Sequence, residues 1–205
     1  MMKYKEALAI VILLGGIYPI YGMEPEYEIV NSGYEYITQV KVAPHAHELL
    51  QAIQDNQVSV VKTLLEKYPS LANEKACSTV GKACFYLIEK AFEYASFSSK
   101  SDDNPYAQII RLFGDHGFDF NTKMLYPNYK DYSFLAYAVN PGEEIPLVIV
   151  KALVESGARP DDKAMKTVDG WISFLSQEKP SGFKNKLEKY QEIKKMFVEA
   201  LIPTR

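Results

Sequence analysis

Three side chains that could bind a metal ion lie within four residues of each other, at His45, His47 and Glu48. On a helix, His45 and Glu48 would share one face, whereas His47 would point elsewhere. The remaining histidine, His116, lies far along the chain, and no second group of ligands accompanies it. A zinc site needs at least three protein ligands. We therefore interpret this segment as the solvated start of a helix, and we predict no metal and no other cofactor.

The two cysteines, Cys77 and Cys84, are seven positions apart. On one continuous helix their Cα atoms would be about 10 Å apart, beyond the roughly 7 Å that a disulfide can span. Gly81 lies between them and could begin that helix, which would leave Cys77 in a flexible lead where bridging is possible. Small buried thiols are the first expectation, and a disulfide remains the open alternative. A nucleophilic role is not expected, because no histidine is placed to activate either thiol.

Motifs of catalysis are missing from the sequence. It contains no Ser-His-Asp set, no glycine-rich phosphate loop and no paired carboxylate motif. Asp102 and Asp103 are adjacent, but they lie in a polar insertion that is more simply a solvated loop. The sequence thus favours binding over chemistry, and we predict that the protein is not an enzyme.

The composition and net charge of the chain indicate which class of partner to expect. The 205 residues are 47% hydrophobic, which is enough for one or two domains with a sizeable core. The 23 basic and 26 acidic residues give a formal net charge of -3, which argues against broad electrostatic capture of nucleic acid. A protein partner is expected, and nucleic acid is not.

Residues 1–22 have the three parts of a secretory signal peptide. Lys3 and Lys5 precede an apolar run of 11 residues, 7–17, and a short segment ends at Gly22. The run is shorter than the roughly 20 residues that span a bilayer, so an uncleaved anchor is the weaker alternative. Cleavage would leave 21 basic and 25 acidic residues, a charge of -4. We expect an exported protein, periplasmic or secreted, without a stable membrane span, in a compartment that permits disulfides.

Helical periodicity begins near His45 and then recurs. Three stretches that begin at His47, Lys90 and Ser133 are 43 residues apart both times. Each has alanine in its sixth place and a large apolar residue three places earlier; the alanines are Ala52, Ala95 and Ala138, and the large residues are Leu49, Phe92 and Leu135. The alanines would let paired helices approach closely while the large residues fill the space between pairs. Such pairs must stack, because one pair cannot bury its apolar face alone.

These stretches resemble the ankyrin repeat family, whose pattern runs T-P-L-H-x-A, a short turn, then V-V-x-x-L-L-x-x-G-A-x-x-N. Residues 47–68 fit that spacing without a gap, with Asn56 in the turn where the family has glycine. Gly117 and Gly157 follow later second helices, where a left-handed residue is wanted. The family's Thr-Pro and histidine are absent, and three other residues occupy the histidine place: Leu50, Glu93 and Ala136.

The resemblance implies an all-α fold, a solenoid of stacked helix-turn-helix repeats. We expect an extended lead-in over residues 23–44, in which residues 37–42 alternate like a strand that would stand alone, followed by three to four repeats over residues 45–205. The second unit needs an insertion at residues 98–104 and a longer first helix from Lys82. Residues 183–201 are expected to form a capping helix, with a membrane-surface helix as the alternative because of its lysines. A generic array of helical hairpins also remains open.

The connector between the second and third units, residues 122–132, contains three tyrosines and a Pro-Asn turn signal. In ankyrin-like stacks such connectors form finger loops that line a concave binding face with the first helices. The resemblance therefore implies partner-binding residues on the connector and the neighbouring first helices: Tyr94, Tyr126, Tyr129, Lys130, Tyr132 and Tyr137. Tyrosine provides large contact area at interfaces; the alternative is that these rings only pack against the neighbouring finger.

The function predicted from the sequence is that of an exported, non-catalytic module for protein-protein interaction. Two alternatives remain from other classes. One is an enzyme whose site is assembled at the repeat insertions, and the other is a structural envelope protein.

Overall fold

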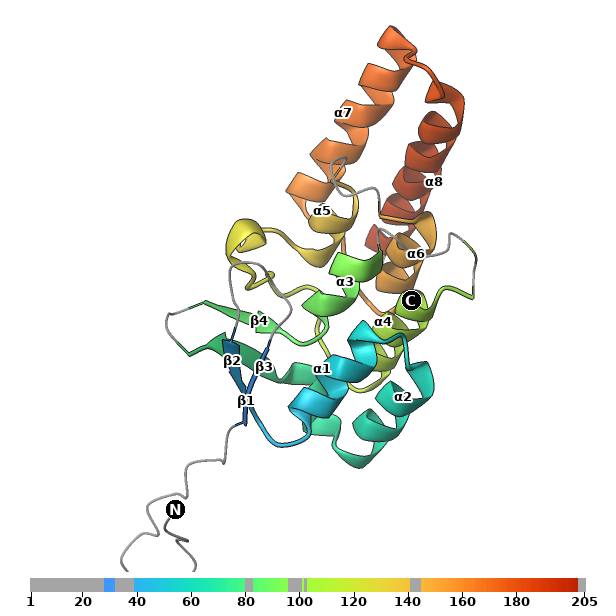
Figure 1. The fold of residues 1–205 in the computed structure, drawn as a ribbon. Coiled ribbons are helices and arrows are strands. Elements are labelled where there is room, and N and C mark those ends of the chain that lie inside the picture. Colours follow the sequence, from blue (N-terminus) through green and yellow to red (C-terminus); the bar gives the residue numbers. More distant parts are fainter. Residues whose placement is uncertain are drawn as a thin grey trace, which may run out of the picture.

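The computed structural model describes residues 28–31, 39–79, 83–95, 101, 103–140 and 145–202. Within them the fold is mostly helical, in line with the expected all-α class (Figure 1). The α-helices are α1 (Ala46–Gln54), α2 (Val58–Lys67), α3 (Glu89–Ala95), α4 (Pro105–Asp115), α5 (Phe134–Ala138), α6 (Leu147–Glu155), α7 (Asp162–Glu178) and α8 (Phe183–Leu201), and the short 3-10 helices are η1 (Pro69–Asn73) and η2 (Pro127–Tyr129).

The helices form hairpins that pack in sequence. Each odd-numbered first helix contacts the even-numbered second helix that follows it, and the second helices contact one another in the order α2, α4, α6, α8. The first helices α1 and α3 also contact each other, as do α5 and α7. The predicted recurrence is thereby confirmed at the level of helical hairpins, because first helices begin at residues 46, 89 and 134.

The repeated residues occupy the positions that the sequence assigned to them. Ala52, Ala95 and Ala138 are each at most 2% exposed. The large partners three places earlier are equally buried, and they are Leu49, Phe92 and Leu135. Small and large side chains thus alternate in one continuous core, which is how helices pack closely without voids.

Turn residues within and after the hairpins also match the predictions. Asn56, Gly117 and Gly157 have φ values of 60°, 84° and 91°, the left-handed region that asparagine and glycine tolerate best. The Asn121 side chain donates to the carbonyl of Gly157 at 3.2 Å and accepts from the Arg159 N–H at 2.8 Å. These bonds tie one hairpin to the next.

A four-stranded antiparallel sheet was not predicted. Its strands, in spatial order, are β1 (Glu28–Asn31), β2 (Gln39–Val42), β3 (Lys75–Ser78) and β4 (Cys84–Tyr86). The expectation that the strand near residues 37–42 would stand alone is wrong, because β2 pairs with β1 on one side and β3 on the other. The pairing joins the lead-in to the segment between the first two hairpins, a contact that local sequence cannot reveal.

Cys77 and Cys84 form a disulfide. The first expectation, free buried thiols, is therefore wrong, and so is a first helix beginning near Lys82, because β4 comes next and α3 begins only at Glu89. The two cysteines are direct partners in the β3–β4 ladder, which brings their Cα atoms to 4.0 Å. A hairpin, rather than a helix, makes a seven-residue separation suitable for bridging.

The last two helices, α7 and α8, form a long terminal hairpin that projects beyond the other hairpins (Figure 1). The bounds of α8 confirm the helix predicted over residues 183–201. The proposed signal peptide lies outside the described residues. Within the described part of the chain, no helix has the length and apolarity needed to cross a membrane.

Candidate functional site

The tyrosine connector, residues 122–132, forms a closed loop between α4 and α5. Its base is held where Lys123 pairs with Ser133 in an isolated antiparallel bridge and the Met124 N–H donates to the Tyr132 carbonyl at 2.9 Å. Met124 is buried, and Tyr129 is the last residue of η2. The connector is therefore a defined element rather than a loose linker.

Glu89, at the start of α3, holds the connector through hydrogen bonds to its backbone. Its carboxylate is 2% exposed and accepts three backbone N–H groups, from Tyr86 at 3.0 Å and from Leu125 and Tyr126 at 2.9 Å each. Burial raises the pKa of Glu89, although the three bonds oppose that shift. One side chain thus joins β4, α3 and the connector.

Four of the predicted binding tyrosines lie in one cluster. Tyr129 is its centre, with ring centroids 4.6 Å from Tyr137, 5.8 Å from Tyr132 and 6.1 Å from Tyr126. The three connector tyrosines are half-buried against the core, and Tyr137 on α5 is buried. The cluster is thus neither an exposed finger nor a fully buried one.

The other two predicted residues lie apart from this cluster's centre. Tyr94 on α3 is half-buried and stacks on Tyr106 of α4, with ring centroids 6.3 Å apart. Lys130 is exposed on the connector. Lys90, one turn before Tyr94, is fully buried and pairs with Glu93, and burial lowers the pKa of its ammonium.

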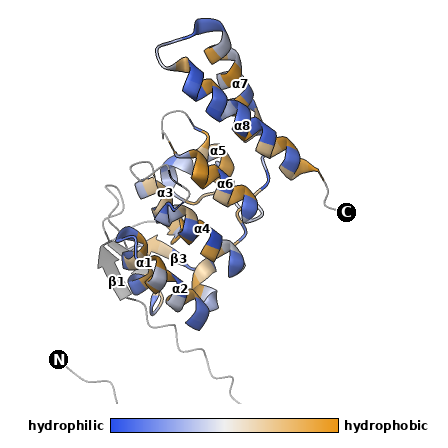
Figure 2. Ribbon diagram, turned by 90° about the vertical axis from the view of Figure 1, so that its right-hand side faces the viewer, coloured by the Kyte–Doolittle hydropathy of each residue, from blue (hydrophilic) through white to orange (hydrophobic). Residues whose placement is uncertain are grey.

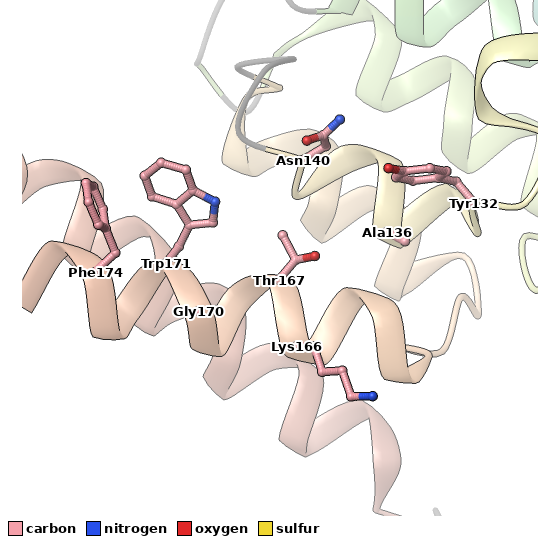
Figure 3. A pocket seen from close by; sticks show the side chains of 8 residues that line it. All are labelled: Tyr132, Ala136, Asn140, Lys166, Thr167, Gly170, Trp171 and Phe174. Atoms are coloured by element: carbon pink, nitrogen blue, oxygen red, sulfur yellow. The ribbon is translucent and has the colours of Figure 1, made fainter.

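An open hollow of about 510 Å³ lies between the end of the connector, α5 and α7 (Figure 3). We call it the aromatic hollow. Its lining combines aromatic, small and polar side chains, namely Tyr132, Ala136, Asn140, Lys166, Thr167, Gly170, Trp171 and Phe174. The size is within the range of sites that bind small ligands or side chains.

The hollow exists because two neighbouring first helices differ in length. Helix α5 has 5 residues and α7 has 17, so α5 covers only part of the α7 face. Beyond it, Phe174 stays 44% exposed and Trp171 is half-buried, with its ring stacked on Tyr190 of α8 at 5.9 Å. In Figure 3 Thr167 and Trp171 point toward the side of the hollow where Asn140 lies.

Cations border the connector end of the hollow. The Lys163 ammonium lies 3.1 Å from the centroid of the Tyr132 ring. Lys166 belongs to the lining, but its side chain runs away from the hollow (Figure 3). Lys123 instead forms an ion pair with Asp161 at 2.6 Å; burial works to raise the pKa of that carboxyl, but the bonds from Lys123 and the Ala164 N–H lower it overall.

A second hollow of about 530 Å³ contains the residues first considered as metal ligands, His45, His47 and Glu48, beside polar residues of α1 and its turn. The His45 ring stacks on Tyr68 at 4.1 Å, and its Nδ1 lies 4.0 Å from the Glu48 carboxylate. Among the described residues, no group of three or more candidate ligands is close enough to hold a metal ion.

Hydrophilic and hydrophobic residues alternate along α7 and α8 (Figure 2), and the lysines of α8 do not form a uniform basic face. Lys189 donates to the Ile145 carbonyl at 2.6 Å and Lys194 pairs with Asp169 of α7 at 2.7 Å. Three glutamates of α8 are exposed as well, and they are Glu188, Glu192 and Glu199. This mixed charge favours a capping helix over a membrane-surface helix.

Sequence reasoning missed Glu89, Trp171 and Phe174. A carboxylate inside the apolar run of residues 87–92 was a signal for Glu89, since such a group must find partners. The signal for the hollow was the spacing of Lys163, Thr167, Gly170 and Phe174, which puts them on one face of α7.

No protein-family model, no curated protein and no solved structure matches this chain.

Proposed function

We propose that the chain is an exported, non-catalytic protein-binding module built of degenerate ankyrin-like repeats, with its binding face on the tyrosine connector and the first helices. The observation that carries this proposal is the aromatic hollow at the junction of those elements. Aromatic side chains that remain partly exposed beside a pre-formed hollow are typical of interaction sites.

The ankyrin-like reading is supported by features that recur from hairpin to hairpin. A buried alanine recurs at the same place of the three repeated stretches, and a glycine with positive φ follows two of the second helices, α4 and α6. Asn73 and Asn121 donate to the carbonyls of Gly117 and Gly157 at equivalent turns, at 3.5 and 3.2 Å. In this proposal these bonds take the place of the histidine contacts of the ankyrin family.

Export is supported by the Cys77–Cys84 disulfide, because such bonds persist in oxidising compartments. The test is mass spectrometry of the protein recovered from its producing cell. We expect an N-terminus near residue 23 and no free thiol. An intact residue 1 with reduced cysteines in the cytoplasmic fraction would contradict export.

Binding is tested by placing the photo-cross-linker p-benzoylphenylalanine at position 174. Val198 on α8 is the matched control position, because it is 47% exposed against 44% for Phe174. In the exported fraction of the producing cell, we expect one protein to be cross-linked stoichiometrically from position 174 and not from position 198. Equal cross-linking from both positions, or none from either, would contradict a binding face here.

The enzyme alternative receives less support from the hollow. Among the described residues, the ionisable side chains of its lining are Tyr132 and Lys166, and Lys166 runs away from its interior (Figure 3). A catalytic site needs convergent groups that can exchange protons or attack a substrate. The same hollow offers apolar contact and hydrogen bonds, which is what a recognition site needs.

A further inference from the structure

The aromatic hollow has a lining that indicates the chemistry of what it binds. We propose that it docks a linear segment of a protein partner, one that inserts an aromatic or large aliphatic side chain and carries a carboxylate a few residues away. This inference rests on the proposed function and deepens it by naming the class of ligand.

The apolar anchor follows from the shape of the hollow. Tyr132, Trp171 and Phe174 supply aromatic walls, and Ala136 and Gly170 add no bulk between them. An inserted side chain would therefore contact ring faces on several sides, the arrangement that gives interface anchors their affinity. Asn140 and Thr167 add groups that can hydrogen-bond to the backbone of an extended peptide.

Gly170 points to a ligand independently of the rings. It lies in the interior of α7, where glycine is less favourable than alanine. Its φ is not positive, and a Cβ added there would meet no atom of the described residues within 4 Å. Neither the backbone conformation nor the packing of the described residues requires glycine at that position. Its effect is to keep the middle of the hollow open.

The carboxylate follows from charge complementarity. Among the described residues, Lys130, Lys163 and Lys166 have no carboxylate within ion-pair distance, unlike the paired Lys123. The acidic residues next to them in sequence, Asp131 and Asp162, are exposed and do not line the hollow. A carboxylate at the connector end would meet the Lys163 ammonium, which lies over the Tyr132 ring. Such a contact contributes chiefly to specificity and association rate.

The test is selection of a random peptide display library on the purified protein, followed by fluorescence anisotropy with the selected peptides. Gly170→Leu adds a large side chain to the lining of the hollow, at a position where a Cβ meets no described atom within 4 Å, and Gln191→Leu adds the same side chain on the exposed surface of α8. We expect selected peptides to combine Phe, Trp or Leu with Asp or Glu within about four residues of an extended chain. Gly170→Leu should weaken binding at least about tenfold, and Gln191→Leu should leave it unchanged.

Charge reversal tests the second half of the proposal. Lys163→Glu combined with Lys166→Glu should weaken binding several-fold and reduce its dependence on salt. Should Gly170→Leu lower the melting temperature, Phe174→Ala replaces it, because that side chain is 44% exposed.

Three results would overturn the inference. The first is a library with no enriched peptide, and the second is enrichment of Lys, Arg or Pro without acidic residues. The third is equal affinity of the selected peptides for Gly170→Leu and for the control variant Gln191→Leu. If position 174 still cross-links a partner in that case, the module function stands and the peptide inference alone fails. If neither experiment detects binding, both proposals fail.

Discussion

Helices α5 and α7 pack side by side as first helices, yet they differ in how much of their surface is covered. All five residues of α5 are buried, whereas α7 buries Ala164, Val168 and Leu175 and leaves Phe174 partly exposed. Helix α5 is covered on two sides, because Phe134 contacts the Phe92 ring of α3 and the helix also packs against α7. In the described chain, no further hairpin packs beyond α7. The same first-helix position is therefore buried in the interior of the stack and partly exposed at its end.

The largest expected effect separates the two phenylalanines of this comparison. Phe134 on α5 is fully buried, with its ring centroid 5.3 to 5.5 Å from those of Phe92, Phe118 and Phe120. Phe134→Ala should lower the free energy of unfolding by about 4 kcal/mol, through lost contacts and a cavity. Phe174→Ala should lower it by less than about 1 kcal/mol, since the ring is 44% exposed.

Urea denaturation of the two variants measures this difference. Similar losses of stability would show that Phe174 belongs to the core of the stack, and the distinction between interior and end would fail.

The next effect concerns Glu89, the carboxylate that fixes the connector to the stack. In Glu89→Gln the amide can accept only through one oxygen, so one backbone N–H would face an NH₂ group. We expect a loss of about 2 kcal/mol of unfolding free energy. Chemical denaturation at a fixed pH measures it, and Glu192→Gln on the exposed surface of α8 is the control.

The stabilising effect of Glu89 should also depend on pH. Its pKa is raised in the folded protein relative to the ordinary value of 4.5, so folding favours the protonated form. The contribution from this shift is fully present below pH 4.5 and is lost as pH rises through the folded pKa. The stability difference between the parent and Glu89→Gln should therefore shrink as pH rises from 4.5 toward neutrality. A difference that grows over that range would contradict the raised pKa.

Two helical glycines provide a sharper version of the comparison. A Cβ on Gly114 of α4 would lie 2.7 Å from the Ser156 Cβ, whereas one on Gly170 would meet nothing within 4 Å. Gly114→Ala should cost about 2 kcal/mol because packed second helices must move apart. Gly170→Ala should stabilise the protein by up to about 1 kcal/mol. Thermal melting of both variants shows whether each one raises or lowers the stability. A destabilised Gly170→Ala would mean that α7 is packed against a neighbour at that position.

The smallest effect concerns the hydrogen bonds between turns. Asn121→Ala removes a donor to the Gly157 carbonyl and an acceptor for the Arg159 N–H. Because these groups are exposed to water, the expected loss is about 1 kcal/mol. Amide exchange should become faster at Arg159 but not at Ala164, whose N–H bonds to Asp161 instead. Unchanged exchange at Arg159 would show that Asn121 does not hold the terminal hairpin to the stack.

Several local features could be predicted from the sequence because they depend on near neighbours. The 43-residue recurrence placed first helices and their buried alanines, and the positive φ of Asn56 and Gly157 followed from the conformational tolerance of those residue types. The amphipathic pattern also gave the bounds of α8. Periodicity of 3.6 residues and turn chemistry are properties of a short segment, so no distant contact was needed.

The sheet and the site depended on contacts between distant segments. Residues 28–31 and 84–86 become part of one sheet only through intervening strands, and that pairing turns Cys77 and Cys84 from separated thiols into a bridge. Likewise, nothing local marks Phe174 as exposed or Glu89 as the anchor of a connector 36 residues away. Sequence alone therefore determined the helical hairpins and their turns. Only the tertiary structure decided which faces stay uncovered, because exposure depends on the length and position of the neighbouring helix.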